Sequence, residues 1–495
     1  MSNAANIVLF AESPVTDWVA DTKYYNNPID PSQEADGIFA DTDGNVVVAM
    51  SGSPGFGVHH YSKYSALKNI RINNGLTVSG GGTFSPDAIF VPYADGTLRA
   101  AYTATFDDPG GVNYWNVFNV YDVDTTDGSL TLFAKGRGSS ISYNDGGYTT
   151  ITHAAGDSSN NFYGCGFTRE QGGYEFPYLV KYNSSGTLQW AKSLQPQKAT
   201  HTAPGVNNAN FGSLQQMTAD SSGNTYVSLR HTTDSSDPPT FTNKVMKFNA
   251  SGTQQWVREI NTYCRDIVAA DASYLYCLST NPDLIITALS ASNGAVSWER
   301  TISLSGSEFT PLNVHLYDGS LYITAKSFVT STSTTGMTWV KMSTSGTFDW
   351  DLHIYADPVS AASGFSNAKN SFVVGGKMYM TFEGLEGITT VVLPVDASKT
   401  GTTIFPHIGF GGSAPFSYNN YKANIIVEDR AVSSATSSNS TSTSSSYSVG
   451  SETITTSNVG TFDLGVSYNA AAIKSMLAPV NDQNPVTAFS KRRIV

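Results

Sequence analysis

The stretch KYNSSGTLQW (Lys181–Trp190) has the pattern of a β-hairpin: an extended start, a Ser-Ser-Gly-Thr turn and a second strand that ends on a large aromatic residue. The same pattern occurs twice more, as KFNASGTQQW (Lys247–Trp256) and as KMSTSGTFDW (Lys341–Trp350). A pattern that recurs at such distances usually builds one repeated architecture. The motif therefore predicts a fold made of repeats.

The glycine in this turn marks further copies of the motif, in which an extended apolar stretch leads into a turn of small residues and then into another strand. Neighbouring copies are 42 to 66 residues apart. Glycine suits such turns because it adopts positive φ without a steric penalty. The predicted turn glycines are Gly75, Gly128, Gly186, Gly252, Gly294, Gly346 and Gly401.

A second motif precedes each copy of the first: a turn rich in Asp, Gly and Asn that opens onto a strand of β-branched and aromatic residues. DSSGNTYVSL from Asp220 is an example. Two hairpins in each repeat of roughly 50 residues give four antiparallel strands, which is the size of a propeller blade. We therefore predict an all-β fold, a seven-bladed β-propeller over residues 1–430. ANIVLFAES (5–13) or YKANIIVED (421–429) would supply the strand that closes the ring.

Four tryptophans recur at one position, just after the turn of the first motif. Large aromatic rings at a repeated position are suited to packing between neighbouring blades. We therefore predict that these residues are structural and do not stack on a ligand: Trp190, Trp256, Trp298 and Trp350.

The segments ITALSASNGAVSWERTI and YLVKYNSSGTLQWAKSL resemble the blades of quinoprotein-like bacterial propellers, and the similarity covers about residues 40–405. The resemblance implies the propeller fold. It implies no particular activity, since such blades occur in enzymes, scaffolds and binding proteins alike. The adjacent cysteines that quinoprotein dehydrogenases commonly carry are absent, and the aspartate of the sialidase turn is missing from STSGTFDW and NSSGTLQW.

Residues 431–495 differ in character, because Ser and Thr dominate much of the segment. Such a segment cannot bury a core of its own, so we predict a linker or an extended C-terminal arm, with a disordered tail as the alternative. YNAAAIKSMLAPV (468–480) is the candidate for a short helix.

Composition narrows the class of function. The 495 residues carry a formal net charge of −12, so electrostatic binding to nucleic acid is not expected. No run of about 20 apolar residues predicts a membrane span. The N-terminus lacks the basic region and long apolar run of a signal peptide. Cys165, Cys264 and Cys277 are predicted to be buried free thiols, with one bridge between Cys264 and Cys277 left open.

Candidate sites of chemistry each have an ordinary alternative that we favour. The acidic groups could bind calcium but also suit plain β-turns, and the pair His59-His60 lies on one expected strand, where neighbours face opposite ways. The arginines are scattered, which favours surface or ion-pair roles. We predict no catalytic, cofactor-binding or metal-binding residue. The residues considered were Asp41, Asp43, Asn45, Asp122, Asp124, Asp127, Arg99, Arg137, Arg169, Arg230, Arg258, Arg265 and Arg300.

The propeller, the start without a signal peptide and the Ser/Thr-rich arm together resemble a structural protein of a tailed bacteriophage. The resemblance implies a non-enzymatic virion component, expected in the tail as a nozzle, fibre or adaptor. It implies a multi-subunit assembly in which the propeller faces and the arm contact other virion proteins. Two alternatives stay open: a propeller that recognises a host glycan through loops such as GFTREQGGYEFPY (166–178), and a hydrolase or oxidoreductase that uses the propeller funnel.

Overall fold

The computed structural model describes residues 7–8, 23–27, 33–40, 46–52, 55–61, 67–77, 83–84, 89–93, 95–107, 114–124, 130–138, 149–169, 175–195, 213–232, 241–260, 266–270, 273–281, 283–303, 307–329, 334–356, 367–384, 387–395, 402–406, 424–428, 433–436, 442–444, 448–451, 454–455 and 465–468.

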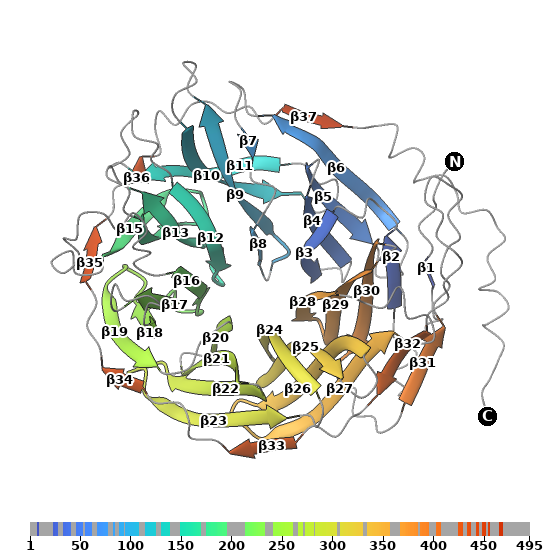
Figure 1. Cartoon of the computed structure of the whole chain (residues 1–495). Helices are drawn as coiled ribbons and strands as arrows, with labels where there is room; N and C mark the ends of the chain where they lie inside the picture. Colours follow the sequence, from blue (N-terminus) through green and yellow to red (C-terminus); the bar gives the residue numbers. More distant parts are fainter. Residues whose placement is uncertain are drawn as a thin grey trace.

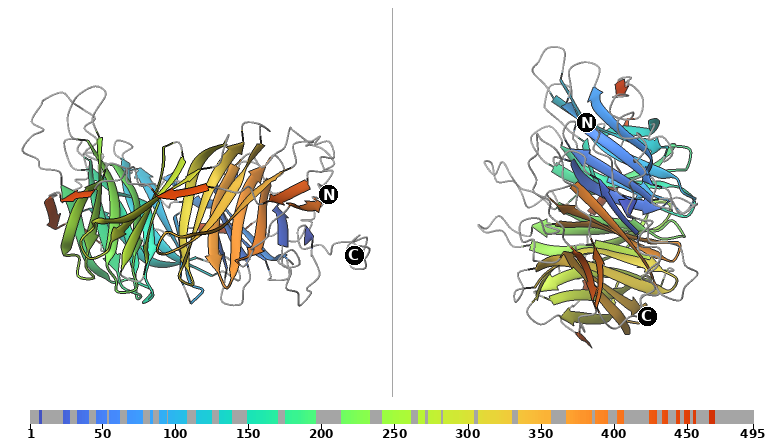
Figure 2. Two further views of the ribbon diagram at one scale, coloured as in Figure 1. Left: turned by 90° about the horizontal axis from the view of Figure 1, so that it is seen from below. Right: turned by 90° about the vertical axis from the view of Figure 1, so that its right-hand side faces the viewer.

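Within these ranges the strands form seven antiparallel sheets that stand in a ring (Figure 1). One sheet shows the common plan: β12 (Thr149–Gly156), β13 (Phe162–Arg169), β14 (Glu175–Tyr182) and β15 (Leu188–Gln195) pair in chain order from the centre outward. The strands run between the two faces of the ring (Figure 2). This arrangement confirms the all-β propeller fold.

Five further sheets repeat the plan. Their strands are β3 (Gln33–Ala40), β4 (Val46–Gly52), β5 (Gly55–Tyr61) and β6 (Leu67–Thr77); β7 (Thr83–Phe84), β8 (Ile89–Pro92), β9 (Leu98–Asp107), β10 (Tyr114–Val123) and β11 (Leu130–Gly138); β16 (Ser213–Ala219), β17 (Thr225–Thr232), β18 (Phe241–Phe248) and β19 (Gln254–Ile260); β20 (Asp266–Ala270), β21 (Tyr274–Asn281), β22 (Asp283–Ser290) and β23 (Val296–Ser303); β24 (Ser307–Tyr317), β25 (Ser320–Val329), β26 (Thr334–Ser343) and β27 (Phe348–Ala356).

The position of a strand within its sheet explains its pattern of burial. In β22, the third strand of its sheet, six consecutive residues from Leu284 to Leu289 are buried, because neighbouring sheets cover both of its faces. In the fourth strand β23 of the same sheet, buried residues are separated by partly exposed ones. Hydrophobic clusters fill the space between neighbouring sheets; in one of them, Phe162 and Tyr182 of one sheet pack with Phe118 of the sheet before it.

The turns between third and fourth strands contain four of the predicted glycines, Gly186, Gly252, Gly294 and Gly346, with φ of 74°, 75°, 71° and 81°. These values lie in the left-handed region that favours glycine. Gly128 and Gly401 lie outside the described residues.

The prediction for Gly75 needs correction, because this glycine lies inside strand β6. In this sheet β5 ends at Tyr61 and β6 begins at Leu67, so the chain turns earlier than the NNG sequence suggests. A fourth strand of 11 residues carries the Asn-Asn-Gly stretch as part of its length. The prediction of a turn at Gly75, which rested on turn residues alone, therefore placed this connection wrongly.

The ring closes through the N-terminus. β28 (Asn367–Val374), β29 (Lys377–Gly384) and β30 (Gly387–Pro394) form the seventh sheet, and β2 (Lys23–Asn27) is its fourth strand, with β1 (Ile7–Val8) beside it. Of the 5–13 segment, residues 7–8 belong to the closing sheet as β1 and pair with β2, which itself pairs with β30. The other candidate for closure, 421–429, does not belong to this sheet: its strand β32 (Asn424–Glu428) lies between β27 and β31 (Thr402–Pro406) at the edge of the neighbouring sheet of β24 to β27.

The C-terminal segment adds one strand to the outer edge of sheet after sheet (Figure 1). β32 pairs with β27, and the later strands pair with fourth strands that lie progressively earlier in the chain. These strands are β33 (Ser433–Thr436) on β23, β34 (Ser442–Ser444) on β19, β35 (Ser448–Ser451) on β15, β36 (Ile454–Thr455) on β11 and β37 (Gly465–Tyr468) on β6. The candidate helix 468–480 lies outside the described residues except for Tyr468, which ends β37.

Candidate functional site

Polar side chains of the described residues bridge several junctions between neighbouring sheets. The indole N–H of Trp190 on β15 donates to the carbonyl of Ala250, in the turn of the next sheet, at 3.0 Å. The ammonium group of Lys181 on β14 donates to the same carbonyl at 3.3 Å. Lys181 and Trp190 are cross-strand partners, so one carbonyl receives both donors. We call this arrangement the inter-sheet clamp.

The clamp recurs at the next two junctions. Trp256 and Lys247 donate to the carbonyl of Ala291 at 3.1 and 2.9 Å. At the following junction Trp298 and the hydroxyl of Tyr276 donate to the carbonyl of Thr344 at 3.2 and 3.1 Å. A carbonyl that accepts two hydrogen bonds has both of its lone pairs satisfied within the protein.

The fourth recurring tryptophan lacks this bond among the described residues. The indole nitrogen of Trp350 has no hydrogen-bond partner there. The part of the next connection that corresponds to the acceptor turn lies beyond Val395, outside the described residues. The ring of Trp350 contacts Tyr322 edge to face, with 6.2 Å between centroids.

The turn glycines fit directly against the tryptophans of the preceding sheet. A Cβ atom at Gly252 would lie 2.8 Å from a ring carbon of Trp190, and one at Gly294 would lie 2.8 Å from Trp256. A Cβ at Gly346 would lie 3.0 Å from Trp298. Glycine is therefore required at these positions for two reasons: the backbone has a positive φ, and a tryptophan ring occupies the space where a Cβ atom would lie.

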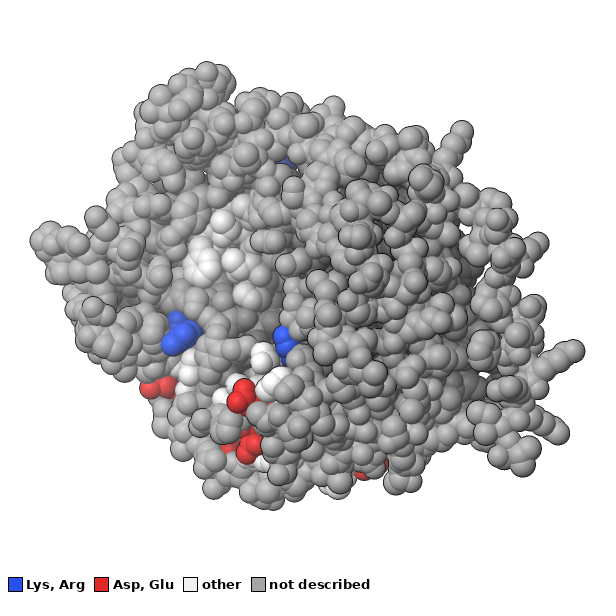
Figure 3. All heavy atoms as spheres, turned by 45° about the vertical axis from the view of Figure 1, so that its right-hand side comes forward, with Lys and Arg blue, Asp and Glu red and all other residues white. Residues whose placement is uncertain are grey.

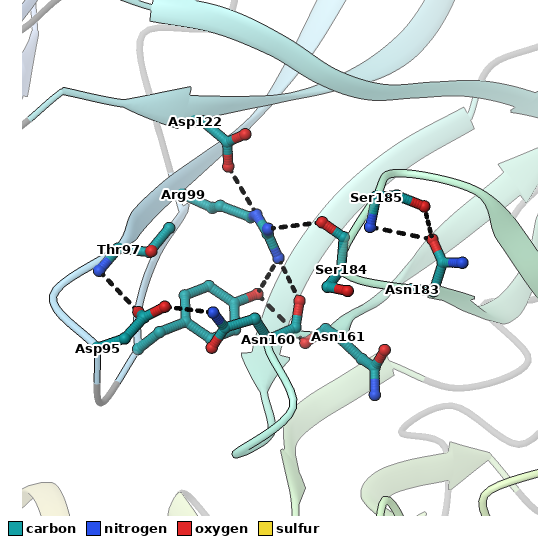
Figure 4. A network of polar contacts seen from close by, with 10 residues as sticks. Asp95, Thr97, Arg99, Asp122, Asn160, Asn161, Asn183, Ser184 and Ser185 are labelled. Carbon is teal, nitrogen blue, oxygen red and sulfur yellow. Dashed lines mark hydrogen bonds and ion pairs between the residues drawn. The ribbon is translucent and has the colours of Figure 1, made fainter.

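At the junction before β12 an arginine performs the same task (Figure 4). The Arg99 guanidinium pairs with Asp122 at 2.8 Å and donates to the carbonyls of Asn160 and Ser184 in the next sheet at 2.6 and 3.5 Å. Its carbon lies 3.6 Å from the centroid of the Phe133 ring. The arginine side chain is only 4% exposed, so these partners replace its water.

The same network shapes the ionisation of a tyrosine. Arg99 donates to the hydroxyl of Tyr93 at 3.1 Å. Burial raises the pKa of Tyr93 to about 12, although the neighbouring arginine acts in the opposite direction. The phenol therefore stays protonated, and it donates to the carbonyl of Asn161 in the next sheet.

The aspartate turns of the second motif are closed by their own hydrogen bonds. One Asp157 oxygen accepts the amides of Ser159 and Asn161, and the other accepts the Asn161 side chain and the Tyr163 hydroxyl. Burial alone would raise the pKa of Asp157, but these hydrogen bonds lower it below its ordinary value.

Asp220 repeats the arrangement with Ser222, Asn224 and Tyr226. The aspartate turns thus use their carboxylates to fix the backbone. The similar group Asp41, Asp43 and Asn45 lies outside the described residues.

The most enzyme-like group is a cluster of His315, Ser371, Thr324 and Asn313 between the sixth sheet and the closing one. The His315 Nε2 and Ser371 Oγ atoms are 2.9 Å apart. Ser371 is also 2.8 Å from the Thr324 hydroxyl, and it donates to the side-chain oxygen of Asn313 at 3.0 Å. Ser371 is 6% exposed. A nucleophile needs an open approach for substrate, and this hydroxyl is enclosed by three partners.

Burial also keeps the histidine of this cluster neutral, since it lowers the pKa of His315 to about 4. Its ring stacks near Trp339, with 6.4 Å between centroids, and meets Phe372 edge to face. The cluster therefore joins two sheets, as the clamps do. Its hydrogen bonds run between side chains of the two sheets.

Several predicted candidates have plain structural roles. Asp122 pairs with Arg99, while Asp127 lies outside the described residues. Arg258 and Arg300 donate to the carbonyls of Asn293 and Gly346 in the next sheet. Within the described ranges no group of three or more His, Cys, Asp or Glu could hold a metal ion.

For the remaining arginine, aspartate and histidine candidates, the structure gives the position in the chain and only some of the contacts. Arg230 lies in β17 and has an interaction partner, while Asp124 follows β10. Side chains of Arg137, Arg169, His59 and His60 are not described beyond their places in β11, β13 and β5. Arg265 lies outside the described residues.

Two of the three cysteines are buried free thiols, Cys165 and Cys277. The bridge between Cys264 and Cys277 that the sequence left open is therefore not formed. Burial raises the pKa of Cys165, so this thiol is unreactive. Cys264 lies outside the described residues.

The stretch 166–178, named in the glycan-binding alternative as a loop, is a loop only in part. Residues 166–169 end β13 and residues 175–178 begin β14, so only 170–174 connect them. Tyr178 is fully buried and stacks near Phe118, with 6.1 Å between centroids. The hydrophobic contact between sheets holds this aromatic ring in the interior.

The charged side chains among the described residues form no continuous basic patch on the face that Figure 3 shows, where acidic and basic groups are interspersed. No helix in the described part of the chain has the length and apolarity that a membrane crossing requires.

Comparison with known proteins places the chain in no family. No protein-family model matches the sequence, and no curated protein does. Solved structures with a similar fold include a prolyl endopeptidase, at 11% identity and a TM-score of 0.42, covering 81% of this chain and 55% of that one. Prolyl oligopeptidase B from Galerina marginata matches at 12% identity and a TM-score of 0.41, covering 80% of this chain and 55% of that one. The chain thus spans about half the length of the structures it matches.

Proposed function

We propose that this chain is a non-enzymatic structural protein of a bacteriophage particle, placed in the tail, where its propeller is a rigid platform for partner subunits. One observation carries the proposal: the polar groups that could perform chemistry are used to join neighbouring sheets or to close turns within a sheet. Arg99, Asp157 and Ser371 each have several partners within the protein. Such groups hold a scaffold in one shape.

Rigidity follows from the way the junctions are built. Each clamp fixes a side chain of one sheet to the backbone of the next, so the sheets cannot slide independently. Hydrophobic clusters between sheets add a second constraint, because close-packed interiors resist deformation. A ring held this way can transmit load between subunits bound to its faces.

Partner contacts are assigned to the two faces of the ring and to the part of the C-terminal arm beyond Tyr468, since the strands up to that residue pair with the ring itself. The faces carry the turns and connections between strands, which are the positions where binding residues most often lie. A net charge of −12 keeps such a particle soluble before it assembles. Partners with complementary basic surfaces are expected to bind in a salt-dependent manner.

The test is the composition of purified particles. Particles from the source culture are banded on a density gradient, and their proteins are identified and counted by mass spectrometry. Antibodies raised against the whole chain then localise it by immunogold electron microscopy, with antibody absorbed on purified protein as the control. Gold at the tail with an integral copy number per particle is the expected result. Recovery of the chain only in the cell or the medium would overturn the virion role.

A separate assay addresses the absence of enzymatic activity. The purified chain is analysed for bound metal by elemental analysis and for a bound quinone by absorbance. It is also screened against peptide and glycoside substrates. Turnover that is lost in Ser371→Ala, with Ser193→Ala on the outer strand β15 as the control, would reject the non-enzymatic proposal.

A further inference from the structure

The six C-terminal strands β32 to β37 form what we call the belt, residues 424–468. Its successive strands pair with sheets that lie progressively earlier in the chain, from the sheet of β24 to β27 back to the sheet of β3 to β6. Each belt strand pairs antiparallel with the fourth strand of its sheet (Figure 1). The belt therefore spans six consecutive sheets with one continuous segment.

The register of the belt is the same on every sheet, because it always pairs with the last residues of the fourth strand. Ser448 to Ser451 pair with 192–195 at the end of β15, and Ser442 to Ser444 pair with 258–260 at the end of β19. Ser433 to Thr436 pair with 300–303 at the end of β23.

The clamps lie at the opposite end of the same strands. Trp190, Trp256 and Trp298 are each the third residue of their fourth strand, next to the turn that precedes it. Antiparallel order puts the first-to-second and third-to-fourth turns on one face of the ring, and the fourth strand ends at the other face. The Arg99 network also joins turns of the clamp face.

We propose that the belt is a fastener for the face of the ring that the clamps do not reach. Clamps tie neighbouring sheets together where the fourth strands begin, and the belt ties them where these strands end. The inference concerns the ring itself and holds whichever partners bind it.

The composition of the belt suits this task. Its strands β33, β34 and β35 have the sequences SSAT, STS and SVGS, which supply no large apolar side chain to pack. Pairing through the backbone does not require one, since the hydrogen bonds join main-chain groups. Short polar strands also cover the outer edge without offering a hydrophobic edge to other molecules.

The spacing of the belt strands fits the step between sheets. Their first residues follow one another at intervals of six to eleven residues. Six extended residues reach roughly 20 Å, about twice the 10 Å at which sheets pack face to face. One interval of chain, strand and connection together, is thus long enough to step from one outer edge to the next, and short enough to limit how far these edges can separate.

The test is amide hydrogen exchange measured by mass spectrometry on a chain that ends at residue 430, with a chain that ends at residue 468 as the control. Removal of the belt strands β33 to β37 is expected to speed exchange at 192–195, 258–260 and 300–303 at least about tenfold, because the alternate amides that donate to the belt lose a strand that opens only rarely. Exchange in the clamp turns, 183–187 and 249–253, is expected to stay within about twofold. Addition of the peptide 431–468 should restore protection.

A single substitution keeps the test decisive if the shortened chain does not fold. Val449→Pro removes a backbone N–H within β35 and is expected to speed exchange at 192–195 alone. Ser438→Pro, between β33 and β34, is the matched control. Unchanged exchange at 192–195 in Val449→Pro would overturn the proposal. So would equal acceleration at the clamp turns, because the belt would then not act on one face.

Discussion

At the scale of single residues, the turn glycines show how one position can meet two demands. Gly252 needs a positive φ and also leaves room for the Trp190 ring of the preceding sheet. Gly319 has a similar φ of 68°, but its missing Cβ would meet nothing within 4 Å. The pair therefore separates the backbone requirement from the packing requirement.

We expect Gly252→Ala to lower the free energy of unfolding by about 2 to 4 kcal/mol, since it adds strain at positive φ to a clash with the ring. Gly319→Ala should cost only about 1 kcal/mol, from the backbone alone. Urea denaturation followed by tryptophan fluorescence gives both values. Equal losses in the two variants would mean that the contact with Trp190 contributes nothing.

The buried histidine His315 makes stability depend on pH. Its pKa of about 4 lies below the ordinary value of 6.5, so the unfolded chain binds the proton more readily between these values. Stability is therefore full above about pH 6.5 and falls as the pH drops towards 4. The loss from this residue is at most about 3 kcal/mol, and His153, with the same lowered pKa, acts in the same direction.

We expect His315→Gln to be less stable than the parent at pH 7.5 and to lose less stability between pH 6.5 and 4.5. Glutamine can still hydrogen-bond to Ser371 but takes up no proton in this range. Unfolding midpoints in urea at four pH values test the expectation. A pH dependence identical to that of the parent would show that His315 does not supply it.

At the scale of elements, the hairpin motif joins two sheets as well as two strands. Lys181 and Trp190 face each other across β14 and β15 and reach one carbonyl at Ala250. Local sequence explains why the hairpin forms. The reason for its lysine and tryptophan is found in the neighbouring sheet.

This geometry predicts that the two donors substitute for each other. Trp190→Phe and Lys181→Met should each cost about 1 kcal/mol in hydrogen bonding, because the Ala250 carbonyl keeps one donor. The double variant should lose about 1 kcal/mol more than the sum, since the carbonyl then has neither. The free energies of unfolding of the four chains form a double-mutant cycle. Additive losses would refute a shared acceptor.

Elements were predicted with uneven success, for identifiable reasons. The repeated motifs predict hairpins correctly, because turn residues and the alternation of strands depend only on nearby residues in the sequence. Gly75 was misplaced because Asn-Asn-Gly can also lie within a long strand such as β6. The burial of Tyr178 at the end of the stretch 166–178 could not be predicted locally, because it depends on Phe118 in the preceding sheet.

At the scale of the whole molecule, the ring has one seam, and the N-terminal strand β2 closes it on β30. A chain that begins at residue 28 lacks β2 and leaves the β30 edge open. A chain that begins at residue 23 lacks β1 but keeps the closing strand.

We expect the chain from residue 28 to unfold at least about 5 °C lower and to aggregate faster, because an open edge pairs with other chains. The chain from residue 23 should stay within about 2 °C of the parent. Differential scanning fluorimetry and light scattering measure both quantities. Equal behaviour of the two shortened chains would show that β2 does not fasten the ring.

The sequence by itself determined the repeat, the all-β propeller class and the residue types of the clamp, because periodic turns and strands are encoded locally. Only the tertiary structure decided which carbonyl each tryptophan meets, which strand closes the ring and where the Ser/Thr-rich segment runs. These depend on contacts between residues far apart in the chain. The belt leaves the least trace in the sequence, since backbone hydrogen bonds hold it and nearly any polar side chain can accompany them.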